Sequence, residues 1–297
     1  MKLRTPAALL VLGILVTACA DASTVPGNGD GGGTGGGTGG GIDHPTGADD
    51  LVLRVSDEGG FVPVEYLLSA MPSFSLFGDG SAVTLGAQIE IYPGPALPPL
   101  ISTPLTEDGV QAVLQAALDA GLDQDREYID MGSTMVADAT TTVFTLTVDG
   151  TTHVTKVYAL GFAGDERPPG MSKEEFDARA RLEALRATLQ DLRGTLPEGS
   201  VGEEEAFTPT GLRLFVSGYR GERDLKQTPV TWPLDTPLPE FGEPASVEGY
   251  ACAAVTGADL EAVLPLAEAA NQLTPWVSDG ERSAILFRPL LPDESGC

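Results

Sequence analysis

The chain contains no apolar run long enough to cross a membrane, although it opens on a short one. Eleven mostly apolar residues, Pro6 to Val16, follow the basic residues Lys2 and Arg4. A membrane-spanning helix needs roughly 20 apolar residues, whereas a shorter run behind positive charges is typical of a secretory signal. We therefore predict an exported protein without a transmembrane helix.

Histidine, cysteine and aromatic residues are scarce. There are two histidines, His44 and His153, three cysteines, and 6% aromatic residues. Zinc sites usually cluster Cys and His, and nucleophilic hydrolysis normally needs a base beside the nucleophile. Neither histidine lies in such a motif, and few aromatic rings are available to stack on a sugar. The sequence therefore predicts no catalytic residue, no cofactor and no metal ligand.

Basic residues are also few, with 17 Lys and Arg against 43 Asp and Glu and a formal net charge of −26. Removing residues 1–18 takes away two bases and leaves 43 acids against 15 bases, a charge of −28. Such a field repels nucleic acid and anionic headgroups, so we expect no nucleic-acid partner. The acidity serves solubility or, alternatively, forms a surface for divalent cations or a cationic partner.

The residues Val16-Thr17-Ala18-Cys19 resemble the lipobox of bacterial lipoproteins. The resemblance implies removal of residues 1–18, a lipid on Cys19 and membrane attachment outside the cytoplasm, since acyl chains anchor a protein by burying methylene groups. Cleavage after Ala20 by an ordinary signal peptidase is the alternative. Residues 19–49 are rich in Gly, Thr, Asp and Pro, a composition that predicts a flexible linker.

Two cysteines remain if Cys19 carries a lipid. An even pair in an oxidising compartment is most simply a disulfide, so we predict a bond between Cys252 and Cys297 that pins the final "PDESGC". Two free thiols are the alternative.

The rest of the chain predicts an α+β fold of mainly antiparallel sheets with a few packed helices. Hairpin signals stand at Gly78-Asp79-Gly80, Asp149-Gly150 and Asp279-Gly280. Helices are expected at 106–121, where Thr106 is the N-cap and Gly121 the stop, and at 172–193, where Ser172 and Glu175 form a capping box. The proline-rich segment 89–104 and the segment 196–211 are predicted to be irregular loops.

A shift of 150 residues aligns Thr106, Ala112, Val113, Leu114, Ala117 and Ala120 with Thr256, Ala262, Val263, Leu264, Ala267 and Ala270. A helix before an Asp-Gly hairpin would thus occur twice, which predicts two related halves, although Pro265 departs from the first copy. The expected organisation is a signal at 1–18, a lipidated linker at 19–49, a first unit at 50–165, a helical connector at 166–210 and a second unit at 211–297.

Acidic residues cluster at Asp123, Asp125, Glu127 and Asp130, and this spacing mimics the start of a calcium loop. Its sixth position is Tyr128 instead of the glycine that the loop geometry needs, and its twelfth is Thr134 instead of glutamate. The triple Glu203 to Glu205 is typical of an exposed loop. We therefore expect no metal at either cluster.

The segment "GGFVPVEYLLSAMPSFSLFGDGSAV", followed by the first helix and by "VADATTTVFTLTVDGTTHVTKVYALG", resembles uncharacterised bacterial lipoproteins of the actinobacterial type and an exported domain of unknown function. The resemblance covers residues 51–161. Pro63 and Tyr66 stand further apart here than in that pattern. The shared motifs are turns, so the resemblance implies no activity.

A tether without catalytic motifs favours a non-catalytic binding or interaction module at the cell envelope, acting on an envelope protein or a small ligand. A carboxylate-dependent hydrolase of cell-wall polymers is the alternative. Convergent carboxylates in a cleft would favour the hydrolase, and an apolar patch would favour the binding module.

Overall fold

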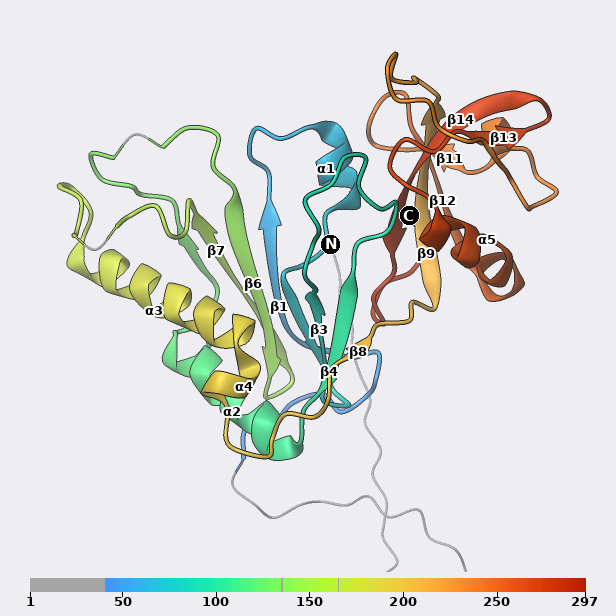
Figure 1. Ribbon diagram of the computed structural model, residues 1–297. Helices are drawn as coiled ribbons and strands as arrows, with labels where there is room; N and C mark the ends of the chain where they lie inside the picture. Colours follow the sequence, from blue (N-terminus) through green and yellow to red (C-terminus); the bar gives the residue numbers. More distant parts are fainter. Residues whose placement is uncertain (1–40, 135, 165) are drawn as a thin grey trace, which may run out of the picture. The chain divides into compact units, whose positions relative to one another are not determined.

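The computed structural model describes residues 41–134, 136–164 and 166–297 (Figure 1). It contains two mainly antiparallel sheets, one of eight strands and one of six, and each sheet has its own helices and hydrophobic core. The predicted α+β fold in two halves is therefore confirmed.

The first sheet has the strand order β5-β7-β6-β1-β2-β3-β4-β8 and is antiparallel except between β5 and β7. Its strands are β1 (Leu51–Glu58), β2 (Phe74–Phe77), β3 (Ser81–Leu85), β4 (Leu100–Pro104), β5 (Arg126–Tyr128), β6 (Thr141–Val148), β7 (Thr151–Tyr158) and β8 (Glu205–Ala206).

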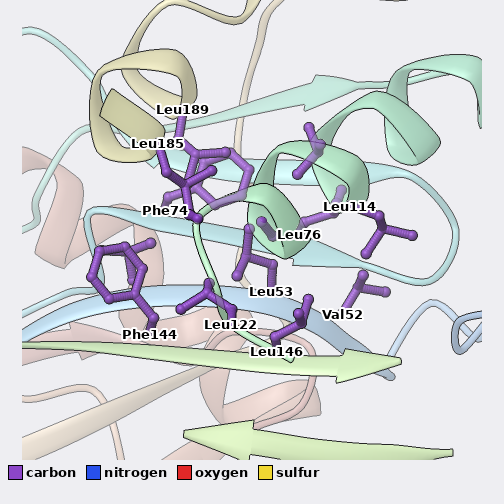
Figure 2. Packing of buried hydrophobic residues seen from close by; sticks show 14 of the residues in the cluster. Val52, Leu53, Phe74, Leu76, Leu114, Leu122, Phe144, Leu146, Leu185 and Leu189 are labelled. Carbon is purple, nitrogen blue, oxygen red and sulfur yellow. The ribbon is translucent and has the colours of Figure 1, made fainter. Parts of the chain in front are cut away.

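Helices α2 (Glu107–Asp119) and α3 (Lys173–Gln190) pack on one face of this sheet, and the short α4 (Leu192–Thr195) follows α3 (Figure 1). Figure 2 shows side chains from sheet and helices pointing toward one another in the core between them. Burying each large apolar side chain contributes roughly 1.5–3 kcal/mol. Fully or almost fully buried members are Leu53, Phe74, Leu76, Leu114, Phe144, Leu146 and Leu185.

Both helices begin where the side-chain pattern predicts. The Thr106 hydroxyl accepts a hydrogen bond from the Gly109 amide at 3.4 Å, and the Ser172 hydroxyl accepts one from the Glu175 amide at 3.1 Å. These bonds satisfy amides that have no partner within the helix. The capping box is only half formed, because the Glu175 carboxylate accepts from Arg179 at 3.0 Å.

The second sheet has the strand order β10-β13-β14-β9-β12-β11 and is antiparallel except between β10 and β13. Its strands are β9 (Gly211–Gly218), β10 (Val230–Thr231), β11 (Glu243–Pro244), β12 (Ala251–Thr256), β13 (Trp276–Ser278) and β14 (Glu281–Pro289), with a 3-10 turn η1 (Leu238–Glu240). Its helix is α5 (Gly257–Ala269), which contains Pro265.

An aromatic group fills the core of the second half. Trp276 packs edge-on against Trp232 and Phe287, with ring centroids 6.1 Å and 5.4 Å apart. Edge-to-face pairs add to the free energy gained by burying the rings. Trp276 and Phe287 are each 1% exposed, and they belong to the same hydrophobic cluster as the buried residues of α5.

The Asp-Gly hairpins form as predicted. Asp149 and Gly150 have φ of 49° and 70°, and Asp279 and Gly280 have φ of 50° and 81°. Positive φ at both central residues defines the turn whose twist matches that of paired strands. Short polar or absent side chains make this conformation accessible.

The relation between the halves is more complex than a repeat of one chain path. Each sheet has one edge at which the outermost two strands are parallel. Counted from that edge, the first six strands of the first sheet have the same sequence of relative directions as the six strands of the second. The hairpins, however, are connected in opposite order, because the first hairpin strand, β6, lies next to β1, whereas in the second half it is the last strand, β14, that lies next to β9. The reversed order argues against a simple tandem duplication.

The packed part of the chain begins earlier than predicted. Residues 41–49 were expected in the flexible linker, yet Ile42 packs against the first core, and its amide donates to the Gln111 side chain at 2.7 Å. The His44 ring, also expected in the linker, has a 5% exposed side chain and lies 3.2 Å from Glu107. The glycine-rich composition of residues 19–49 gave no indication of these contacts, because they depend on residues of α2, more than 60 residues further along the chain.

Both predicted loops also contain strands. Segment 89–104 ends in β4. The backbone amides available for pairing with β3 belong to residues 100–103, because proline has no amide hydrogen. Pro99 therefore precedes the paired residues and Pro104 is the last of them. Segment 196–211 contains the two-residue strand β8, which pairs with β4. The predicted helix 172–193 ends at Gln190, and α4 follows it separately.

Candidate functional site

A groove of about 590 Å³ lies beside the proline-rich segment 86–99. We call it the apolar groove, because no charged side chain lines it among the described residues. Its walls come from α1 (Val64–Ser69), from segment 86–99 and from the residues after α5. Its lining includes the side chains of Tyr66, Met71, Ile89, Ile91 and Gln272.

Backbone hydrogen bonds fasten segment 86–99 at its ends and to the second half. Gly86 donates to the Pro99 carbonyl at 2.7 Å, and Ala96 donates to the Ala270 carbonyl at 3.1 Å. The Gln272 amide donates in turn to the Gly94 carbonyl at 2.9 Å. Proline restricts φ along the segment, so the wall of the groove is held without regular secondary structure.

Several large apolar side chains at the groove are exposed to solvent. Ile89 is 67% exposed, Ile91 55% and Tyr66 54%, and the neighbouring Tyr92 is 61% exposed. Leaving such surface in water forgoes about 25 cal/mol per Å². Contiguous exposed apolar surface with a polar rim marks a binding site more often than an accident of folding.

Helix α1 contacts β14 and forms one wall of the groove. None of its residues is buried, and it begins directly after Pro63, whose fixed φ suits the start of a helix. The Glu65 carboxylate accepts a hydrogen bond from the Tyr250 hydroxyl at 2.9 Å. Burial raises the pKa of Tyr250, and the hydrogen bond and charge of Glu65 raise it further.

Two acidic residues, Glu90 and Glu222, lie next to residues of the apolar groove without lining it, and we call them its acidic rim. Glu90 is exposed between Ile89 and Ile91, and the Tyr92 hydroxyl donates to the Glu222 carboxylate. This hydrogen bond raises the pKa of Tyr92, with smaller contributions in the same direction from burial and from the Glu222 charge. The rim therefore favours a partner that brings positive charge beside its apolar side chains.

A second hollow, of about 460 Å³, contains three arginines, one from each of three strands. We call it the arginine hollow. Arg54 lies on β1, Arg213 on β9 and Arg288 on β14. In a chain with 17 basic residues against 43 acids, three converging guanidinium groups require nearby compensation.

The C-terminal tail, residues 291–297, supplies that compensation for two of the arginines. Arg54 donates to both carboxylate oxygens of Asp293, at 3.0 and 2.7 Å. Arg288 donates to both oxygens of Glu294, at 2.6 and 2.8 Å, and also to the Ala70 carbonyl at 3.0 Å. Paired donors of this kind fix geometry as well as charge, so the tail joins the two halves.

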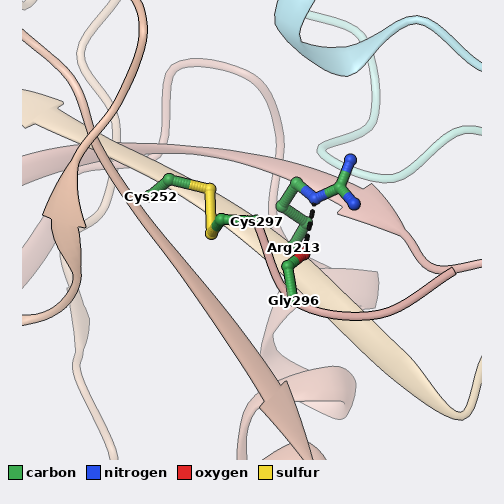
Figure 3. Close-up of a disulfide and its surroundings, with 4 residues drawn as sticks. All are labelled: Arg213, Cys252, Gly296 and Cys297. Carbon is green, nitrogen blue, oxygen red and sulfur yellow. Dashed lines mark hydrogen bonds between the residues drawn. A yellow bond between two sulfur atoms is a disulfide. The ribbon is translucent and has the colours of Figure 1, made fainter. Parts of the chain in front are cut away.

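A disulfide secures the end of the tail. Cys252 on β12 and Cys297 are bonded, with their Cα atoms 6.1 Å apart, inside the range for a disulfide. Figure 3 shows the bond beside Arg213, whose Nε donates to the Gly296 carbonyl at 2.8 Å. The predicted pairing of these two cysteines is confirmed.

Two of the four acidic residues whose spacing mimics a calcium loop accept hydrogen bonds from separate backbone amides. Asp125 accepts from the Val154 amide at 2.8 Å, and Asp130 accepts from the Gly132 amide at 2.7 Å. Between them lies β5, an edge strand in which neighbouring side chains point to opposite faces. Within residues 41–134, 136–164 and 166–297, no three His, Cys, Asp or Glu side chains form a group suited to a metal ion.

The remaining predicted residues are easily placed. His153 lies on β7 opposite Leu146, as a residue of the sheet. Glu203 to Glu205 are exposed. Cys19 lies outside the described residues, so its lipidation stays a prediction.

Glu294 is unsuited to act as a general acid, the role a carboxylate-dependent hydrolase would require. Burial works to raise its pKa, but the hydrogen bonds and charge of Arg288, together with the Leu291 amide and the charge of Arg54, outweigh burial and lower it. A general acid needs a pKa near the working pH. Asp57, which also lines the arginine hollow, accepts a hydrogen bond from Thr142 at 2.6 Å.

Neither the apolar groove nor the arginine hollow was predicted from the sequence. The only sequence signal for the groove was the presence of two isoleucines, Ile89 and Ile91, in a proline-rich segment predicted to be a loop. No local pattern connects Arg54 with Asp293, which lies 239 residues further along the chain.

Comparison of the chain with known protein families, with curated proteins and with solved structures found no match. No helix in the described part of the chain combines the length and apolar character needed to cross a membrane.

Proposed function

We propose that the protein is a non-catalytic binding module, held outside the cytoplasm by a lipid on Cys19, and that its partner binds in the apolar groove. The exposed Ile89 and Ile91 within an acidic rim are the observation that carries the proposal. The partner expected there is an envelope polypeptide that presents apolar side chains beside Lys or Arg, because it must match both the groove and the net charge of −26.

Substituting Ile89 by serine should weaken binding of an amphipathic Lys-Leu peptide by about fivefold to tenfold, since an apolar contact is lost. Added salt should weaken binding further, because it screens the acidic rim. Calorimetric titration gives both quantities. Ile129 is also 67% exposed but does not line the groove, so Ile129→Ser is the matched control.

Equal weakening by Ile89→Ser and Ile129→Ser would contradict the proposed groove, and so would binding that is unchanged in both. The natural partner is best sought by capture from the envelope with the wild-type protein and Ile89→Ser side by side. A protein retained equally by the two is not a ligand of the groove.

Replacing Cys19 by serine should move the protein from the membrane fraction to the soluble or secreted fraction, because serine has no thiol to receive the lipid. Fractionation and immunoblotting of cells of the native host measure the shift. Cys297→Ser makes the same chemical change outside the lipobox and should stay with the membrane. Retention of the Cys19→Ser protein in the membrane fraction would refute the lipid anchor.

A further inference from the structure

The three arginines of the arginine hollow differ in how their charge is compensated. Arg54 and Arg288 each form a paired hydrogen bond with a carboxylate of the C-terminal tail. Within the part of the chain that the structure describes, Arg213 donates through Nε alone, to the Gly296 carbonyl. Among the described residues no carboxylate lies within ion-pair distance of Arg213, so its two terminal nitrogens, which form the fork that matches a carboxylate, have no anionic partner.

The surroundings of Arg213 make this unpaired charge costly. Burial lowers the pKa of Arg213, the neighbouring Arg288 lowers it further, and Glu294 opposes them only in part. An anion bound at the fork would counter the effects of both burial and Arg288. The side chain is half-buried, so its interaction with an anion is less screened than on an open surface.

The rest of the lining indicates what kind of anion fits. Leu67, Leu68 and Phe215 line the hollow, and so do the acids Asp57 and Glu58. One unpaired guanidinium compensates one negative charge. A phosphate carries nearly two negative charges, so part of its charge would remain uncompensated beside Asp57 and Glu58. These apolar side chains can contact a hydrocarbon chain, but they cannot form hydrogen bonds with a polar ligand.

We propose that Arg213 binds the carboxylate of a small monoanionic amphiphile, whose hydrocarbon part lies against Leu67, Leu68 and Phe215. This site is separate from the apolar groove, although Ala70 and Met71 line both. It gives the protein a small-molecule ligand in addition to the polypeptide partner proposed above.

Octanoate is a suitable probe, with acetate and inorganic phosphate for comparison. Titration calorimetry on the disulfide-bonded protein should give octanoate binding at least about tenfold tighter than acetate, because buried methylene groups add to the affinity. Phosphate should bind more weakly than octanoate.

Arg213→Gln should weaken octanoate binding by about tenfold or more, since it removes a charge-assisted pair of hydrogen bonds. Arg213→Lys keeps the charge and guards against loss of fold in the glutamine variant. Lysine cannot donate the two parallel bonds, so we expect binding about threefold to tenfold weaker than wild type. Arg282→Gln makes the same charge change at an exposed position of β14 and should bind as wild type does.

Three results would overturn the proposal. The first is octanoate binding within twofold of wild type in both Arg213 variants. The second is tighter binding of phosphate than of octanoate. The third is octanoate binding that Ile89→Ser abolishes and Arg213→Gln does not, which would place the amphiphile in the apolar groove and leave the function proposed for that groove intact.

Discussion

Replacing Arg288 by alanine is expected to lower the free energy of unfolding by about 3–5 kcal/mol, the cost of breaking a buried ion pair by removing one partner. Arg288 is 8% exposed. Its loss would leave the Glu294 carboxylate and the Ala70 carbonyl without their shared donor. Because Ala70 belongs to the first half and Glu294 to the tail, the contact between the halves should loosen as well.

Urea unfolding at neutral pH measures this loss, and Arg282→Ala on the same strand is the exposed control. The double variant Arg288→Met with Glu294→Leu should recover part of the stability, because two apolar side chains of similar volume remove the unpaired charge. A loss below about 1 kcal/mol in Arg288→Ala would mean that the pair adds no more than a surface salt bridge.

The pH dependence provides an independent measurement of the same pair. The pKa of Glu294 lies below its ordinary 4.5 in the folded protein. A carboxyl group with a lowered folded pKa contributes stability above its unfolded pKa, and that contribution is lost as the pH falls through the folded value. The wild-type protein should therefore lose stability below about pH 4.5, and Arg288→Ala should lose less over the same interval.

Replacing Cys297 by serine should lower the free energy of unfolding by about 4 kcal/mol in the chain-entropy estimate for the loop that the disulfide closes. The bonded cysteines are 45 residues apart. The loss acts through the unfolded chain, which regains freedom, and also through the tail, whose contacts with Arg54 and Arg288 are no longer pinned at their far end. Urea unfolding of the oxidised proteins gives the difference.

The double variant Cys252→Ser with Cys297→Ser is the control for this prediction. It should match Cys297→Ser in stability and should not respond to reductant, whereas the wild-type protein should weaken on reduction. Thiol titration of the denatured, unreduced protein purified from its native host tests the bond itself. Two free thiols in the described part of the chain would contradict it.

The apolar groove and the arginine hollow lie on either side of the segment that contains α1, Ala70 and Met71. The Arg288 hydrogen bond to the Ala70 carbonyl therefore holds a wall common to both. If both proposals hold, variants of Arg288 should affect binding at each site, whereas Ile89→Ser and Arg213→Gln should each affect one. This pattern would separate a shared structural support from the contacts made by each ligand.

The turns, helix starts and disulfide could be predicted because each depends on few residues. Asp149-Gly150 and Asp279-Gly280 adopt positive φ wherever strands flank them, and Thr106 and Ser172 cap the helix that follows within three residues. The cysteine pairing followed from counting, once Cys19 was assigned to the lipid. The turn and capping signals act over a few neighbouring residues and change little with the rest of the fold, whereas the disulfide, which spans 45 residues, was predicted from the number of cysteines alone.

Long-range packing decided what no local pattern contained. Strand β9 is central in the second sheet because β12 and β14 pair on its two sides. The order of the hairpin strands β13 and β14 in the sheet depends on which of the two pairs with β9. The tail is ordered because Arg54, Arg213 and Arg288 come from separate strands to meet it. Residues 41–49 are packed because Gln111 and Glu107 receive them. Except for Arg288 and Glu294, which are six residues apart, these contacts join residues distant in sequence, so their free energy exists only once the sheets have formed.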